Sequence, residues 1–194
     1  MLAAQRVCPQ RPTHIARVEV LRAAPRRAAL TCRAALKVGD SLPDFTLETD
    51  TGAMLSSKEM VRGHGAVLFV YPQACTSGCT LQASAFRDNI RAFADRGYAV
   101  YGMSADPPAA QAGWKAEHGF PFPLLSDGSK TALAALGALG PDGGIKRSHY
   151  VVAKGGQLED VKPMRRFSWQ LGQLRRRLGA DSLMAAAALA AVAD

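Results

Sequence analysis

Cysteine is scarce in this sequence, and its scarcity limits the chemistry open to the chain. The 194 residues contain four cysteines, at positions 8, 32, 75 and 79. Cys75 and Cys79 are the two outside the first 35 residues, and a single pair four positions apart cannot serve as a disulfide scaffold for a domain of this size. No histidine or further cysteine stands near them at the spacing of metal ligands, so we predict no metal centre. The two thiols are left for redox or nucleophilic chemistry, or for inert packing.

Apolar runs of membrane-spanning length are also missing. The Ala-rich end, residues 183–194, favours helix but is too short to cross a bilayer, so we predict no membrane span and treat residues 182–194 as a tail. Hydrophobic residues make up 48% of the chain, which suffices for one domain with a core but not for two large ones. We place that domain at residues 36–181. Neither a Ser-His-Asp arrangement nor a phosphate-binding glycine loop is evident.

Acidic residues are nearly absent from the first 35 positions. This segment holds seven arginines and a single acid, Glu19, so it carries +6 of the net charge of +8. The rest of the chain is nearly neutral, which argues against a nucleic-acid partner, because such a partner needs a basic cluster on a folded face. An Arg- and Ala-rich segment without an unbroken apolar run is typical of an organellar transit peptide. We predict one at residues 1–35; the alternative is an ordinary disordered N-terminal arm.

The body of the chain alternates between strand and helix patterns. Residues 45–55 alternate around the turn Asp50-Thr51-Gly52, which predicts a hairpin. Residues 66–71 form a continuous apolar run, typical of a central strand buried on both faces. From Thr80 the apolar spacing becomes helical, and Gly97 is expected to end that helix.

The second half continues the alternation. Residues 98–103 predict a strand, and Asp106 is expected to cap a helix that Pro107 and Pro108 open. Further elements are expected at residues 121–125 (extended), 130–136 (helix), 148–153 and 157–159 (a β-hairpin) and 167–178 (a basic amphipathic helix). Strands that alternate with helices call for parallel neighbours, and the late hairpin adds antiparallel ones. The predicted fold is a thioredoxin-like α/β sandwich, with a mixed central sheet, helices on both faces and an N-terminal β-hairpin.

Cys79 occupies a position that suits a nucleophile. It follows a buried strand and a short loop of small residues, and it stands in the first turn of the next predicted helix. Ligands bind at the carboxyl ends of strands in such folds. A helix N-terminus presents unpaired N–H groups and a partial positive charge, both of which favour a thiolate. The alternative is a buried structural cysteine, which is common.

The residues around Cys79 resemble a known family. Pro72 to Cys79 reads Pro-Gln-Ala-Cys-Thr-Ser-Gly-Cys and matches the peroxiredoxin signature Pro-x-x-x-Thr-x-x-Cys. The continuation resembles the Q-type subgroup, also called bacterioferritin comigratory proteins, of the plant and algal organellar type. Further matches follow at residues 80–88, 102–106, 122–127 and 146–152, so that the resemblance covers about residues 37–178.

The resemblance implies a thiol peroxidase and assigns roles to particular residues. Cys79 would attack the peroxide and become a sulfenic acid. Pro72 and Thr76 would be the signature residues, and Arg147 the arginine that stabilises the thiolate and holds a peroxide oxygen; without the family, Arg147 would read as a surface residue. Gln82 stands where a polar residue orients that arginine, although an exposed helix position is an equal interpretation.

The resemblance also implies partners. Hydrogen peroxide and organic hydroperoxides would be the substrates, and thioredoxin or another thiol the reductant. No cofactor is required, a monomer is expected, and a chloroplast is favoured over a mitochondrion.

Two positions depart from the Q-type pattern. Ser84 stands five residues after Cys79, where many relatives carry a second cysteine, and Cys75 stands four residues before it. Ser77 replaces the usual proline, so the loop is expected to be looser. Three interpretations follow: Cys75 forms the resolving disulfide, an external thiol reduces Cys79 directly, or Cys75 is a bystander.

Two other functions compete with a peroxidase. A thiol–disulfide oxidoreductase of thioredoxin type would use the same fold, but its cysteines are separated by two residues and here three intervene. A redox-regulated binding protein without peroxidase activity would also fit a chain that lacks the usual second cysteine.

Overall fold

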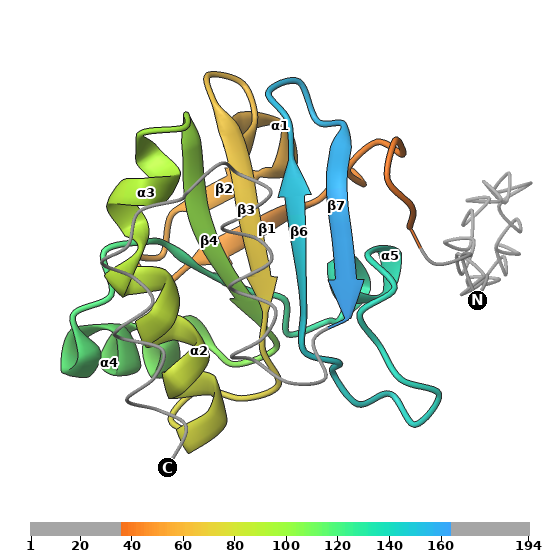
Figure 1. Ribbon diagram of the computed structural model, residues 1–194. Coiled ribbons are helices and arrows are strands. Elements are labelled where there is room, and N and C mark those ends of the chain that lie inside the picture. The colour runs from red at the N-terminus through yellow and green to blue at the C-terminus, as the bar shows by residue number, and fades with distance from the viewer. Residues whose placement is uncertain (1–35, 164–194) are drawn as a thin grey trace, which may run out of the picture. The chain divides into compact units, whose positions relative to one another are not determined.

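The computed structural model describes residues 36–163, which are built around one seven-stranded sheet with the strand order β2-β1-β5-β4-β3-β6-β7 (Figure 1). The strands are β1 (Thr46–Thr49), β2 (Met54–Ser56), β3 (Gly65–Val70), β4 (Tyr98–Ser104), β5 (Leu124–Ser126), β6 (Ser148–Val152) and β7 (Leu158–Pro163). The helices are α1 (Ser57–Met60), α2 (Ser77–Asp88), α3 (Ile90–Ala94), α4 (Pro108–His118) and α5 (Thr131–Ala135). The predicted transit segment, the closing helix at 167–178 and the Ala-rich tail lie outside the described residues.

The N-terminal hairpin is confirmed. β1 and β2 pair antiparallel, with Leu47 opposite Leu55. Gly52 makes the turn between them with a φ of 81°, in the left-handed region that glycine adopts without strain. Its N–H donates to the carbonyl of Thr49 at 2.9 Å. The hairpin is attached to the main sheet through an antiparallel pairing of β1 with β5.

The strand predicted to be buried on both faces is also confirmed. β3 pairs parallel with β4 on one side and antiparallel with β6 on the other, and all six of its residues are buried. Because successive side chains point to opposite faces, Leu68 and Val70 enter one core while Val67 and Phe69 enter the other. β3 therefore joins the two cores of the domain.

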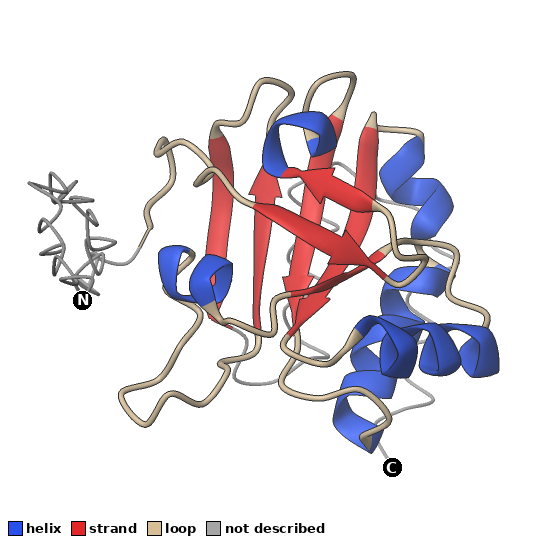
Figure 2. Ribbon diagram, turned by 180° about the vertical axis from the view of Figure 1, so that it is seen from behind, coloured by secondary structure: helices blue, strands red, loops and turns tan. Residues whose placement is uncertain are grey.

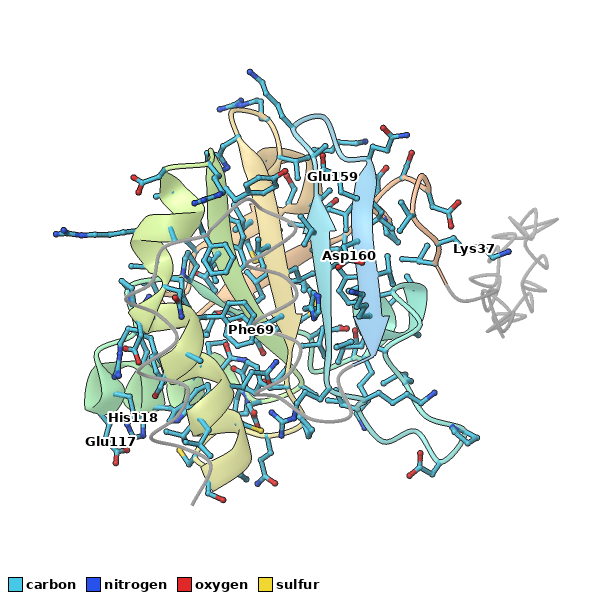
Figure 3. All side chains as sticks on the ribbon, in the orientation of Figure 1. Lys37, Phe69, Glu117, His118, Glu159 and Asp160 are labelled. Atoms are coloured by element: carbon cyan, nitrogen blue, oxygen red, sulfur yellow. The ribbon has the colours of Figure 1, made fainter. Side chains whose placement is uncertain are left out.

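Helices cover both faces of the sheet. α2 and α3 lie on the face turned to the viewer in Figure 1, and α1 and α5 lie on the opposite face, which Figure 2 shows from the front. On the α2 face, Phe69 of β3, which is labelled in Figure 3, stacks on Phe86 of α2 with ring centroids 4.6 Å apart. Trp114 of α4 joins the same core. On the other face, Met60 and Leu133 are fully buried in the second core.

The helix predicted from Thr80 to Gly97 differs in two ways from the observed segment. It begins three residues earlier, at Ser77, because the small polar residues of the loop are already helical. It also breaks at Asn89, which lies at φ −110° and ψ 10° and whose side-chain amide donates to the carbonyl of Ala85 at 2.7 Å. Asn favours such local bonds over a continuous helix. Gly97, at a φ of 75°, follows the second helix as expected.

Asp106 does not cap α4, contrary to the sequence prediction. The N-cap is Pro107, and no side chain caps this helix end. The Asp106 carboxylate points instead to the loop after β3, where its Oδ2 accepts from the N–H of Ala74 at 2.7 Å and from the hydroxyl of Ser104 at 2.9 Å. An aspartate before two prolines is typical of a cap, but here a tertiary contact takes its side chain.

The topology brings two distant segments of the chain to one edge of the sheet. The carboxyl ends of β3 and β4 lie at the same edge because these strands are parallel, with Val70 beside Met103. β6 runs the opposite way, so its first residue, Ser148, lies opposite Val70. The loop that leaves β3 therefore sits beside the residue that precedes β6.

Candidate active site

Cys79 is the third residue of α2 and lies in its first turn. Its side chain is 1% exposed and belongs to the core on the α2 face. Its N–H donates to the carbonyl of Thr76, the N-cap residue, at 3.1 Å. The sulfur is thus placed where the positive end of the helix dipole favours an anion.

Arg147 directly contacts the sulfur. One terminal nitrogen of its guanidinium donates to Cys79 Sγ at 3.4 Å, and the other donates to the carbonyl of Gly78 at 3.2 Å. A guanidinium is charged at every pH that the protein meets, so it stabilises a negative sulfur. Sixty-eight positions separate the two residues in the sequence, and the antiparallel pairing of β3 with β6 is what brings them together.

Gln82 holds the arginine. Its side chain is fully buried, which excludes the exposed helix position that the sequence also allowed. Its Oε1 accepts from Arg147 at 2.5 Å, and its Nε2 lies 3.5 Å from the carbonyl of Val70. Gln82 stands three residues after Cys79 on α2, so both side chains project from neighbouring positions of one helix face.

Thr76 and Pro72 bound the loop in front of Cys79. Thr76 is half-buried, and its hydroxyl donates to the carbonyl of Gln73 at 3.0 Å. Since the hydroxyl hydrogen is used there, the oxygen is left to accept a hydrogen bond from an incoming molecule. Pro72 is exposed and follows the buried Tyr71 at the end of the central strand.

Asp106 is the site neighbour that sequence reasoning missed. Through its bond to Ala74 it anchors the cysteine loop to the end of β4, and Ser126 of β5 donates to its backbone carbonyl at 2.7 Å. The signal was present, because Ser104 and Asp106 follow a buried strand at the sheet edge where ligands bind. The two prolines that follow Asp106 instead led to the prediction that it caps a helix.

Tyr71 lies beneath the same loop with its side chain fully buried. Burial raises the pKa of its phenol, and the negative charges that Asp106 and Cys79 can carry raise it further. The ring packs against Trp114 at a centroid distance of 5.0 Å. Tyr71 therefore contributes a buried, neutral side chain next to the site.

Cys75 is exposed, and neither it nor Cys79 takes part in a disulfide. Its φ is 59°, which is rare for a residue with a side chain. It precedes the N-cap of α2, so it stands outside the helix. The regular spacing of helical residues therefore does not govern the separation of the two cysteines.

Within residues 36–163, no three His, Cys, Asp or Glu side chains gather in a way that could hold a metal ion. Over the same range, no helix has the length and apolar character needed to span a bilayer.

Comparison with known proteins places this geometry in a family. Residues 38–161 match the model of the AhpC/TSA family. Peroxiredoxin bcp1 of Schizosaccharomyces pombe is 40% identical over 121 residues, which span 62% of this chain and 62% of that protein. Peroxiredoxin Q, chloroplastic, of Populus jackii is 38% identical over 97 residues, which span 50% of this chain and 45% of that one.

A solved structure matches more of the chain. The crystal structure of peroxidoxin BcpB from Mycobacterium tuberculosis aligns with a TM-score of 0.68 at 30% identity, covering 82% of this chain and 99% of that one. The match confirms the thioredoxin-like fold expected from the order of strands and helices. Taken with the family model and the relatives of the Q/BCP subgroup, it shows that the chain is a peroxiredoxin and belongs to the AhpC/TSA family.

Proposed function

We propose that this peroxiredoxin reduces hydrogen peroxide and organic hydroperoxides through Cys79, with Arg147, Thr76, Gln82 and Pro72 completing the site. The observation that carries the proposal is the contact of 3.4 Å between the Arg147 guanidinium and the sulfur of a cysteine in the first turn of a helix. Two independent sources of positive potential act on one sulfur, and the thiolate is the nucleophilic form of cysteine.

In the proposed reaction, the Cys79 thiolate attacks one oxygen of the peroxide. A sulfur–oxygen bond forms, the oxygen–oxygen bond breaks, and the departing oxygen takes a proton and leaves as water or an alcohol. Cys79 is left as a sulfenic acid, the first oxidation product of a cysteine thiolate, which thiols can reduce. Sulfur supplies both electrons.

The other residues have separate tasks in this step. The Arg147 guanidinium stabilises the thiolate and the charge that develops on the departing oxygen. The Thr76 oxygen accepts a hydrogen bond from the peroxide and so orients it, because its own hydrogen is held by Gln73. Gln82 holds the guanidinium in place by accepting a hydrogen bond from it. Pro72 follows the central strand and lies in the loop that leads to Thr76.

We propose thioredoxin as the reductant, a monomeric state and an organellar location, with a chloroplast favoured over a mitochondrion. Support for the location comes from the chloroplastic Populus relative and from the Arg-rich, acid-poor residues 1–35. Cell fractionation of the tagged full chain tests it, and recovery in the cytosol alone would contradict it.

A paired assay separates the proposed function from a thiol–disulfide oxidoreductase. The full chain and its Cys79→Ser variant are given hydrogen peroxide with dithiothreitol, and in parallel are tested for the reduction of insulin disulfides. We expect peroxide consumption that is lost in Cys79→Ser, and no catalysis of insulin reduction. Insulin reduction without peroxide turnover would overturn the proposal.

A further inference from the structure

Helix α2 lacks the second cysteine that would form a disulfide with the oxidised Cys79. Ser84, five positions after Cys79, cannot form a disulfide. Cys75 is the other cysteine in the described part of the chain, and it is a free thiol exposed to solvent. It stands on the opposite, N-terminal side of Cys79, in the loop rather than on the helix.

The loop is fixed immediately before Cys75. The N–H of Ala74 is held by the Asp106 carboxylate at 2.7 Å, and Asp106 is in turn tied to Ser104 and Ser126. Cys75 follows this anchor, and its left-handed φ of 59° turns the chain toward Thr76 and α2. A thiol at this point is therefore held beside the N-terminus of α2.

The first turn of α2 lacks the side-chain contacts that usually stabilise a helix N-terminus. Thr76 makes no side-chain cap, and the turn contains no acidic residue to complement the helix dipole. The Thr76 carbonyl accepts from the N–H groups of Cys79 at 3.1 Å and Thr80 at 2.9 Å. The bond from Arg147 to Cys79 Sγ joins two opposite charges only while the sulfur is a thiolate. Conversion to a sulfenic acid removes the negative charge, weakens this bond and so favours release of the turn.

We infer that Cys75 resolves the oxidised Cys79, an inference that rests on the proposed function. The Cys75 thiolate attacks the sulfur of the sulfenic acid, a sulfur–sulfur bond forms, and the sulfur–oxygen bond breaks. The hydroxide that leaves takes a proton and becomes water. A disulfide needs β-carbons about 3.5–4.5 Å apart, so the first turn of α2 opens and Cys79 moves toward the anchored Cys75. An external dithiol of the thioredoxin class then reduces the exposed disulfide.

Peptide mass mapping tests this inference directly. Both cysteines lie in one tryptic peptide, residues 63–87, which contains no internal lysine or arginine. The full chain is used with Cys8→Ser and Cys32→Ser, so that neither of these thiols can pair. After one equivalent of peroxide, we expect this peptide to lose two hydrogen atoms, and we expect Cys75→Ser to carry a dimedone-reactive sulfenic acid on Cys79 instead. Ser77→Ala, at an exposed neighbouring position, is the control and should form the disulfide as the parent does.

The outcomes distinguish the two proposals. A Cys79 sulfenic acid in the parent, with no loss of two hydrogens at any time, would overturn the role of Cys75 and leave the peroxidase function standing. No oxidation of Cys79 at all would overturn both. In steady state, the rate of peroxide turnover with thioredoxin should be at least about tenfold lower in Cys75→Ser than in the parent, which corresponds to about 1.4 kcal/mol in the resolving step. The rate at which peroxide first oxidises Cys79 should be unchanged. Unchanged turnover with thioredoxin would contradict the inference.

Discussion

At the scale of single residues, the site depends on where one guanidinium is held. Arg147 spans the sulfur of Cys79, the carbonyl of Gly78 and the side chain of Gln82. A planar fork of donors can serve several acceptors at once, whereas an ammonium group is a point charge on a flexible stem. The arrangement therefore depends on arginine rather than on positive charge in general.

Arg147→Lys tests that dependence. Lysine keeps the charge but cannot reach all three acceptors, so we expect the second-order rate of Cys79 oxidation by hydrogen peroxide to fall by about 10²–10³-fold, the usual effect of losing one oxyanion donor. Stopped-flow measurement on the reduced protein gives this rate. Arg91→Lys, at an exposed position on α3, should leave it unchanged. A fall of less than about threefold in Arg147→Lys would show that charge alone suffices.

We expect Asp106 to contribute by holding the loop rather than by taking part in the reaction. Its Oδ2 accepts two hydrogen bonds, from Ala74 and Ser104. Asp106→Asn removes the charge that strengthens both bonds. We therefore expect the free energy of unfolding to fall by about 1–3 kcal/mol and the Ala74 amide hydrogen to exchange faster with solvent. Urea unfolding and hydrogen exchange measure the two effects. Asp95→Asn, at the exposed end of α3, is the control, and equal effects in the two variants would refute the anchoring role.

At the scale of elements, close packing of β4 against its neighbours sets the position of the sheet edge that carries the site. A β-carbon added to Gly102 would lie 2.6 Å from a methyl carbon of Leu124 and 2.8 Å from the ring of Phe69. β3 and β5 flank β4 on its two sides. Glycine is thus required in the middle of this strand for the ring to fit, in spite of its poor strand propensity.

The pair Gly102→Ala and Gly113→Ala tests this packing. Overpacking at Gly102 should lower the free energy of unfolding by about 1–3 kcal/mol. Gly113 lies within α4 with no atom near its missing β-carbon, so alanine there should raise the free energy of unfolding by about 0.5–1 kcal/mol. Urea denaturation of both variants gives the two signs. A neutral or stabilising Gly102→Ala would contradict the packing described above.

The elements also show what the sequence could and could not predict. The hairpin, the doubly buried strand and the alternation of strands and helices follow from local periodicity and are confirmed within residues 36–163, although the short helix α1 was not predicted. The break at Asn89 was missed because the apolar spacing continues across it, from Phe86 to Phe93. The role of Asp106 was misassigned because its partner, Ala74, lies 32 residues away. Periodicity carries no information on such tertiary hydrogen bonds.

The grouping of the candidate site residues could be predicted for a different reason. Cys79, Thr76 and Pro72 form one short motif, but no pattern within the chain links Arg147 to it. Only the resemblance to a family named that arginine, and the antiparallel register of β3 and β6 supplies the physical cause of the contact. The burial of Gln82 likewise depends on packing between α2 and the sheet, which a helix pattern alone does not reveal.

At the scale of the whole molecule, the phenols link folding to alkaline pH. The chain has four tyrosines. Burial raises the pKa of Tyr71, Tyr101 and Tyr150, and burial together with the hydrogen bond to Glu159 raises the pKa of Tyr98 to about 12. The folded chain therefore keeps phenolic protons that the unfolded chain releases near pH 10.

This difference fixes the sign of the pH dependence. Above about pH 10 the unfolded state binds fewer protons than the folded state, so the free energy of unfolding should fall as the pH rises toward 12. Below about pH 10 the four phenols should contribute no slope. Urea unfolding across this range, together with phenolate absorbance, measures the effect, and Tyr98→Phe should make the decline shallower. A free energy of unfolding that rises with pH in this window would be inconsistent with the raised pKa values.

The central claim is that Cys79 is the sulfur that the peroxide oxidises, and trapping with dimedone tests it most directly. The reduced full chain receives a single equivalent of hydrogen peroxide with dimedone present, and its tryptic peptides are mapped by mass spectrometry. We predict that Cys79 carries the first adduct in the Cys75→Ser variant, and that Cys79→Ser yields no adduct and no rapid loss of peroxide. Rapid peroxide consumption that survives in Cys79→Ser, with the adduct on another cysteine, would contradict the account.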